Sequence, residues 1–235
     1  METTSATGDG RVLSRSASTE RFTHGPRPRT RGWSHLVAAV VALPGALWWI
    51  ASVPGGQGRV GVAGFGLGAA AMFTASALLH LRRWPEATCE RLVRLDHSGI
   101  YLAIGGTGLA IGTLGLDGWP GQLLVTISVV GATVGIVLTW LPFAPPRGFN
   151  NATYLTLGWA PIVLIPWLWM DAGARTVGLL LAGGVLYTVG ATIVGLRRPD
   201  PVPQVFGYHE LWHLLVIAAV SVHAWMIVDL VARQG

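Results

Sequence analysis

Seven runs of about 20 mainly apolar residues constrain the fold of this chain more than any other feature. A helix needs about 20 such residues to cross the hydrocarbon core of a bilayer. Because lipid offers no hydrogen-bond partners, a spanning segment must pair its own backbone groups, as a helix does. We therefore predict an all-α, polytopic membrane protein with a seven-transmembrane-helix bundle. The expected spans are about 33–53, 60–81, 96–116, 120–142, 152–170, 174–196 and 209–231.

The composition supports a membrane location. Hydrophobic residues make up 51% of the chain, charged residues only 11%, and the mean hydropathy is +0.53. A soluble domain carries about 25% charged residues, so this chain has too little polar surface to cover itself in water. The 32 glycines suit transmembrane helices that approach closely. The single cysteine, Cys89, excludes an intramolecular disulfide and is interpreted as a bystander.

The basic residues indicate topology rather than nucleic-acid binding. All 16 are arginine, and six of them precede the first apolar run. Residues 1–32 are otherwise rich in Ser, Thr, Gly and Pro, so we predict a disordered basic cytoplasmic tail followed by a membrane domain over 33–235. With the N-terminus inside, 13 arginines lie on the inner side and three on the outer side. This positive-inside bias places the C-terminus outside and indicates an inner or plasma membrane protein.

Four polar residues fall at the inner ends of the expected helices. They are His80, Asp96, His209 and His213, and Ser34-His35 at the start of the first run shares their level. Ionisable groups at membrane depth are costly and mark functional sites. Taken singly, such a residue could instead cap a helix or pair with an arginine, as Asp96 could with the nearby Arg94. Their common level favours a metal site inside the bundle.

The spacing of these residues is typical of a zinc site. His209 and His213 are four residues apart and project from one helix face, and Ser76 and His80 repeat this relation. Three imidazoles and one water form the open tetrahedral arrangement of catalytic zinc, which lowers the pKa of the water to about 7. Asp96 would then orient the water or receive its proton. Ser76 would hydrogen-bond the water or a substrate oxygen.

Other histidines and acids give competing interpretations. The string from His209 to His213 also fits the H-E-x-x-H pattern of metalloproteases, with Glu210 as general base. Glu210 lies about 100° around the helix from His209 and is expected to face the headgroups. His223 lies about 15 Å deeper than His213 and is expected to be an interhelical hydrogen bonder. His97, His24 and Asp229 are given no role.

Three motifs resemble those of the bacterial hemolysin III family. They are Ser76-x-x-x-His80, the run from Leu95 to Tyr101, and the run from Gly207 to His213 with His223 ten residues later. Gly183-Gly184-x-x-Tyr187-x-x-Gly190, Gly158-Trp159 and Ser34-His35 add to the resemblance, which spans about residues 33–228. That family belongs with the progestin and adipoQ receptors and, more distantly, the alkaline ceramidases.

The resemblance implies a seven-helix bundle with zinc near the cytoplasmic face. His80, His209 and His213 would be the ligands, with Asp96 holding a zinc-bound water and Ser76 beside it. Two departures stand out. Arg31 occupies a position where the family usually has Asn, and Gly108-Leu109-Ala110 replaces a usual Tyr-Thr-Pro.

These observations lead to several functional hypotheses. The first is a zinc-dependent hydrolase of a lipid amide or ester, acting in membrane homeostasis on a substrate that enters between helices. The second is a non-enzymatic sensor of membrane state, or receptor-like protein, with structural zinc. The third is a pore, which the lack of a long polar stripe disfavours, and the H-E-x-x-H protease remains a fourth. In each case the partners are membrane lipids or a lipid substrate or ligand.

Overall fold

The computed structural model describes residues 27–142, 146 and 148–234, and this part of the chain is helical with one isolated β-bridge between Val202 and Phe206. Most of the predicted disordered tail, residues 1–26, lies outside it. The elements are α2 (Trp33–Ser52), α3 (Gln57–Leu81), α4 (Glu86–Leu114), α5 (Gly118–Trp140), α6 (Phe149–Gly158), the 3-10 helix η1 (Ala160–Leu164), α7 (Ile165–Leu196) and α8 (Tyr208–Ala232).

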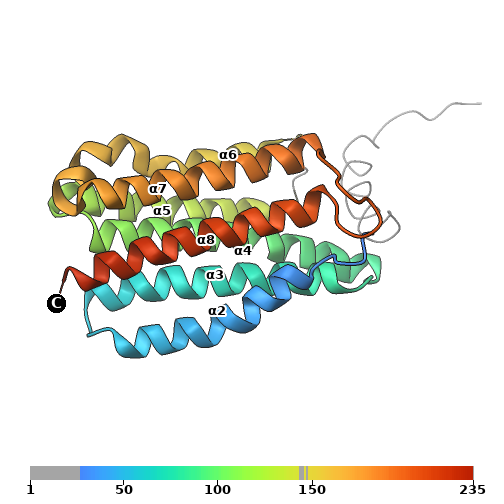
Figure 1. The fold of residues 1–235 in the computed structure, drawn as a ribbon, viewed down its shortest axis with the longest axis horizontal. Helices are drawn as coiled ribbons and strands as arrows, with labels where there is room; N and C mark the ends of the chain where they lie inside the picture. The colour runs from blue at the N-terminus through green and yellow to red at the C-terminus, as the bar shows by residue number, and fades with distance from the viewer. Residues whose placement is uncertain (1–26, 143–145, 147, 235) are drawn as a thin grey trace, which may run out of the picture.

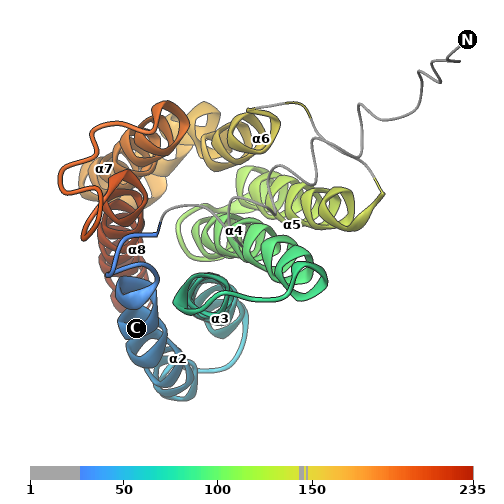
Figure 2. The same ribbon diagram turned by 90° about the vertical axis from the view of Figure 1, so that its right-hand side faces the viewer.

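The helices run roughly parallel to one long axis (Figure 1). Seen along that axis, α8 lies between α2 and α7, and α3 and α4 lie across the bundle from it (Figure 2). The end of α3 and the beginning of α8 meet at the same end of the bundle. This arrangement brings residues about 130 positions apart in the sequence into one layer.

The chain reverses direction within the element labelled α7. Gly173 has non-helical backbone angles, φ 81° and ψ 171°, which interrupt the helix. Just before it, the Ala172 carbonyl accepts a hydrogen bond from Arg233 near the C-terminus. Figure 1 shows the ribbon travel from α6 to this far end and return along α7. The predicted break at Asp171–Gly173 therefore coincides with a turn between two antiparallel arms.

Five helical stretches of the described chain are long and apolar enough to cross a membrane. They are α2, α3, α5, α8 and the 48-residue stretch Phe149–Leu196 that contains the reversal. Large apolar side chains cover the outside of the bundle, including Trp48, Leu47, Val41, Met170 and Leu196. A water-exposed surface rarely carries so large an apolar area. The protein is an all-helical, multi-pass integral membrane protein.

One predicted helix boundary is wrong. We expected a helix to begin at Asp96, but α4 begins ten residues earlier, at Glu86. The charged residues before Asp96 were interpreted as a loop, yet they form helical turns in which Arg94 pairs with Glu90 at 2.7 Å. Such i, i+4 pairs stabilise exposed helices. Asp96 therefore projects from within a helix whose first turns extend beyond the apolar layer.

Candidate metal centre

Three histidines from two helices converge at one end of the bundle. His80 comes from the last turn of α3, and His209 and His213 come from the first two turns of α8. The Nε2 atoms of His80 and His209 lie 3.2 Å apart, and one ligand nitrogen from each of the three lies within 4.8 Å of the others. His80 and His213 are buried, and His209 is half-buried. The structure thus brings together all three predicted ligand residues.

The donors present fit a metal ion. A neutral imidazole nitrogen binds zinc at about 2.0–2.1 Å, and three such nitrogens leave one tetrahedral position open. Among the described residues, His213 Nδ1 is buried with no hydrogen-bond partner. His35 of α2 stacks on His213, with ring centroids 3.8 Å apart, and supports its orientation.

Asp96 and Ser76 lie beside the histidine cluster. Ser76 is one helical turn before His80 on α3, and it lines the same cavity as Asp96 of α4. Asp96 Oδ2 lies 4.0 Å from His80 Nε2. This distance is too long for a direct hydrogen bond but fits a bridging atom between the two groups. The five predicted site residues therefore occupy one region.

A cavity of about 210 Å³ opens from this cluster into the bundle. Asp96, His209 and His213 line one end, and His223 lines a deeper part. Most of the other lining side chains are apolar, among them Ile100, Ile104, Ile111, Leu155, Leu180 and Val216. A largely apolar cavity with a few convergent polar groups is typical of a small-molecule site.

The sequence interpretation missed several residues of this cavity. His97, which we gave no role, lines the cavity, and its Nδ1 lies 3.1 Å from the Asn150 amide nitrogen. Tyr154 also lines it, and within the described chain its buried hydroxyl has no hydrogen-bond partner. Helical periodicity offered a signal, because Asp96, Ile100, Ile104, Thr107 and Ile111 follow one face of α4.

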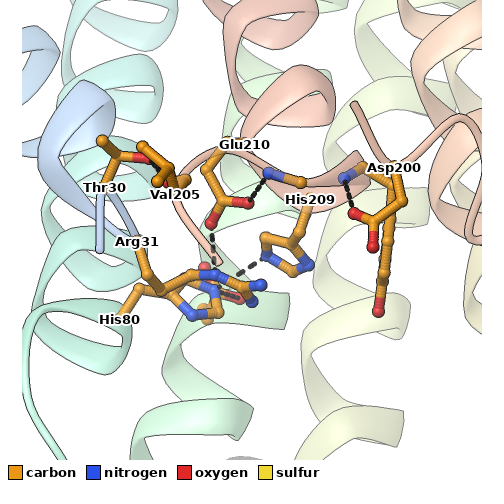
Figure 3. A network of polar contacts seen from close by, with 10 residues as sticks. Thr30, Arg31, His80, Asp200, Val205, His209 and Glu210 are labelled. Carbon is orange, nitrogen blue, oxygen red and sulfur yellow. Dashed lines mark hydrogen bonds and ion pairs between the residues drawn. The ribbon is translucent and has the colours of Figure 1, made fainter. Parts of the chain in front are cut away.

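Glu210 does not face the headgroups, contrary to our expectation. Its side chain is only 2% exposed, one carboxylate oxygen accepts a hydrogen bond from the Gly207 amide at 2.9 Å, and the other pairs with Arg31 (Figure 3). The carboxylate thus caps α8 and neutralises a cation. Both of its oxygens are engaged, which disfavours Glu210 as the general base of a metalloprotease.

Residues before α2 cross over the histidine end of the bundle. Arg29 donates a backbone hydrogen bond to Gln204 at 3.0 Å, and Thr30 bonds Val205 through both backbone and side chain. Gly32 follows with φ 85°, and a Cβ there would lie 2.8 Å from the His80 carbonyl carbon, so this position requires glycine. Arg31, a departure from the family pattern, is thereby placed to pair with Glu210.

Asp229 lies at the opposite end of the bundle. It pairs with Arg233 at 2.9 Å and with Arg175 at 3.7 Å. These contacts tie α8 to the beginning of the second arm of α7, far from the histidine cluster. The ion pairs of Asp229 therefore give this residue a structural role.

Comparisons with known proteins agree with these motifs. Residues 24–224 match the family model described as Haemolysin-III related. The chain is 33% identical over 190 residues to Hemolysin-3 of Bacillus cereus, covering 78% of this chain and 82% of that protein. It is 30% identical to the Hemolysin-3 homolog of Bacillus subtilis over 65% of this chain and 68% of that protein. It is also 27% identical to the adiponectin receptor protein of Drosophila melanogaster, over 81% of this chain and 48% of that protein.

Proposed function

The chain belongs to the haemolysin-III related family, and on that premise we propose that it is a zinc-dependent hydrolase of a lipid amide or ester. His80, His209 and His213 would hold the zinc near the cytoplasmic face. The observation that carries the proposal is the position of these three histidines at one end of an apolar cavity. A lipid carbonyl could reach the cluster while its chain occupies the cavity.

The site residues divide the chemistry between them. Bound zinc would supply a Lewis acid that polarises a carbonyl and acidifies water near neutral pH. Asp96 would orient the attacking water and take its proton, because its carboxylate lies next to His80 inside the cavity. Ser76 would hold that carboxylate in place through its hydroxyl, since both side chains line the same cavity. The apolar lining excludes bulk water and strengthens these polar interactions.

The proposal is tested by measuring metal and activity on the same preparation. Purified protein is expected to contain about one zinc per chain and to release fatty acid from at least one member of a panel of long-chain lipid amides and esters. A chelator should remove both, and zinc should restore both. If zinc is present but no lipid in the panel is cleaved, the sensor with structural zinc is favoured instead. Zinc-dependent cleavage of peptides would favour the protease.

We also propose seven membrane crossings with the N-terminus inside. α4 would add a sixth stretch to the five apolar ones, and the reversal at Gly173 would divide Phe149–Leu196 into two crossings. The described inner side would then carry most of the arginines outside the tail, in agreement with the positive-inside rule.

Cysteine labelling in intact cells tests this orientation. In a Cys89→Ser background, Arg175→Cys is expected to react with an impermeant maleimide added outside. Arg198→Cys is expected to react only after the cells are opened, because it lies on the side of the histidine cluster. The reverse pattern would overturn the orientation, and labelling of both from outside would overturn the crossing count.

A further inference from the structure

His223 lies in a well-defined position deep in the bundle. Its side chain is 4% exposed and lines the cavity below the histidine cluster. Its Nε2 lies 3.3 Å from the Leu180 carbonyl oxygen of α7. Gly183 makes room for the ring, since a Cβ at that position would overlap the imidazole. Gly183, which the metal centre does not use, therefore helps to hold His223 in this orientation.

The contact with Leu180 fixes the hydrogen-bonding character of the other ring nitrogen. A carbonyl oxygen can only accept, so Nε2 carries the proton in this contact. In a neutral imidazole Nδ1 is then an acceptor with a free lone pair. Within the described chain, Nδ1 of His223 is buried and has no hydrogen-bond partner. Buried acceptors are normally satisfied, so this atom indicates a missing donor.

The surroundings of His223 restrict what that donor can be. The neighbouring cavity wall is largely apolar, with Leu180, Leu181 and Val216 among its residues. Tyr187 packs against His223 with ring centroids 5.7 Å apart, but its hydroxyl makes no hydrogen bond to Nδ1. His223 is ten residues beyond His213 on α8, which places it about 15 Å further along the helix. A polar group bound at the histidine cluster is therefore too far away to reach it. A donor on a chain that extends down the cavity would lie at the right depth to reach it.

We propose that the cavity binds a long-chain lipid that carries a hydroxyl group on its chain, and that His223 Nδ1 accepts the hydrogen bond from this hydroxyl. An unsubstituted chain would leave the acceptor unsatisfied, and a keto group would offer it only another acceptor. This inference deepens the proposed function, since it assumes that the cavity takes a lipid chain. It adds a feature of the substrate class that the metal centre does not define.

Competition binding with positional isomers tests the inference. Full-length protein in detergent is loaded with a fluorescent fatty acid, which is displaced by octadecanoic, 2-hydroxyoctadecanoic or 12-hydroxyoctadecanoic acid. The wild-type protein is expected to bind the 12-hydroxy acid about three- to tenfold more tightly than octadecanoic acid, the effect of one net hydrogen bond. The 2-hydroxy acid should gain no affinity from His223, because its hydroxyl stays near the carboxylate.

Two variants give matched controls. His223→Phe keeps a ring but removes the acceptor, and it should bind the 12-hydroxy acid and octadecanoic acid equally. Gly183→Ala leaves residue 223 as histidine but should displace its imidazole. This variant should therefore show a smaller preference for the 12-hydroxy acid. Retained preference in His223→Phe, or equal wild-type affinity for the 12-hydroxy acid and octadecanoic acid, would overturn the inference. Should His223→Phe fail to fold, the wild-type isomer series and Gly183→Ala still decide the question.

The result separates this inference from the proposed function. A hydroxyl preference in a protein that cleaves no lipid would support the binding site and contradict the hydrolase. Lipid cleavage without a preference for the hydroxylated chain would support the hydrolase and contradict the binding site. If the protein takes up neither the fluorescent fatty acid nor any of the three acids, the cavity does not take a lipid chain and both proposals are overturned.

Discussion

Alanine at His80, His209 or His213 is expected to remove most of the zinc from the purified protein. Each substitution leaves two imidazoles, whereas zinc sites in proteins normally use three or four protein ligands. Metal analysis after dialysis against a weak chelator measures the loss. Zinc should also raise the unfolding temperature of the wild-type protein, because a ligand at 100 times its Kd stabilises the folded state by about 2.7 kcal/mol. The three variants should lack this shift.

His97→Ala and His223→Ala provide the controls for this prediction. Both residues line the same cavity, but neither belongs to the cluster whose ligand nitrogens lie within 4.8 Å of one another. Both variants should therefore keep about one zinc per chain and its thermal shift. Equal zinc loss in all five variants would mean that the metal depends on the general packing of the cavity and not on the three histidines.

The sequence was sufficient to predict an all-helical membrane protein and the end of the bundle that holds the histidines, because both depend on local patterns. Apolar runs predict where helices lie, and the i, i+4 spacing of His209 and His213 predicts that both face one direction. The break at Asp171–Gly173 was also local, since glycine permits the positive φ that the reversal uses. His80 could be added because its predicted helix ends at the depth where theirs begins.

What could not be predicted depends on contacts between distant segments. Glu210 was expected to face the headgroups, because nothing near it in the sequence indicated a cation 179 positions away. Its partner Arg31 belongs to a segment that we interpreted as part of a disordered tail. The predicted beginning of α4 was wrong for a different reason. Charged residues were assigned to a loop, although a helix can extend beyond the apolar layer where its charged side chains reach water.

Asp96→Asn is expected to lower lipid hydrolysis by about 10²–10⁴-fold while the zinc stays bound. The substitution keeps the size of the side chain, but it removes the group that would accept a proton. Because Asp96 lies outside the three-histidine cluster, metal content should remain at about one zinc per chain. The measurements are kcat for fatty acid release and zinc content on the same sample.

Glu210→Gln separates this mechanism from that of an H-E-x-x-H protease. A protease would need Glu210 as its base, so the variant would lose activity as severely as Asp96→Asn does in our proposal. In the structure Glu210 pairs with Arg31 and caps α8, so the substitution should instead lower the free energy of unfolding by about 1–3 kcal/mol. Its folded fraction should keep kcat within a few-fold of wild type.

The two variants therefore give a decisive pattern. An inactive, zinc-loaded Asp96→Asn beside an active but less stable Glu210→Gln supports Asp96 as the general base. The opposite ranking would replace the lipid hydrolase with the protease. A third outcome is also informative: if both variants keep a reproducible activity, neither carboxylate moves the proton. If instead neither the wild-type protein nor a variant cleaves any lipid, the zinc would fix α3 to α8 as a structural ion, in the way that a sensor of membrane state would require.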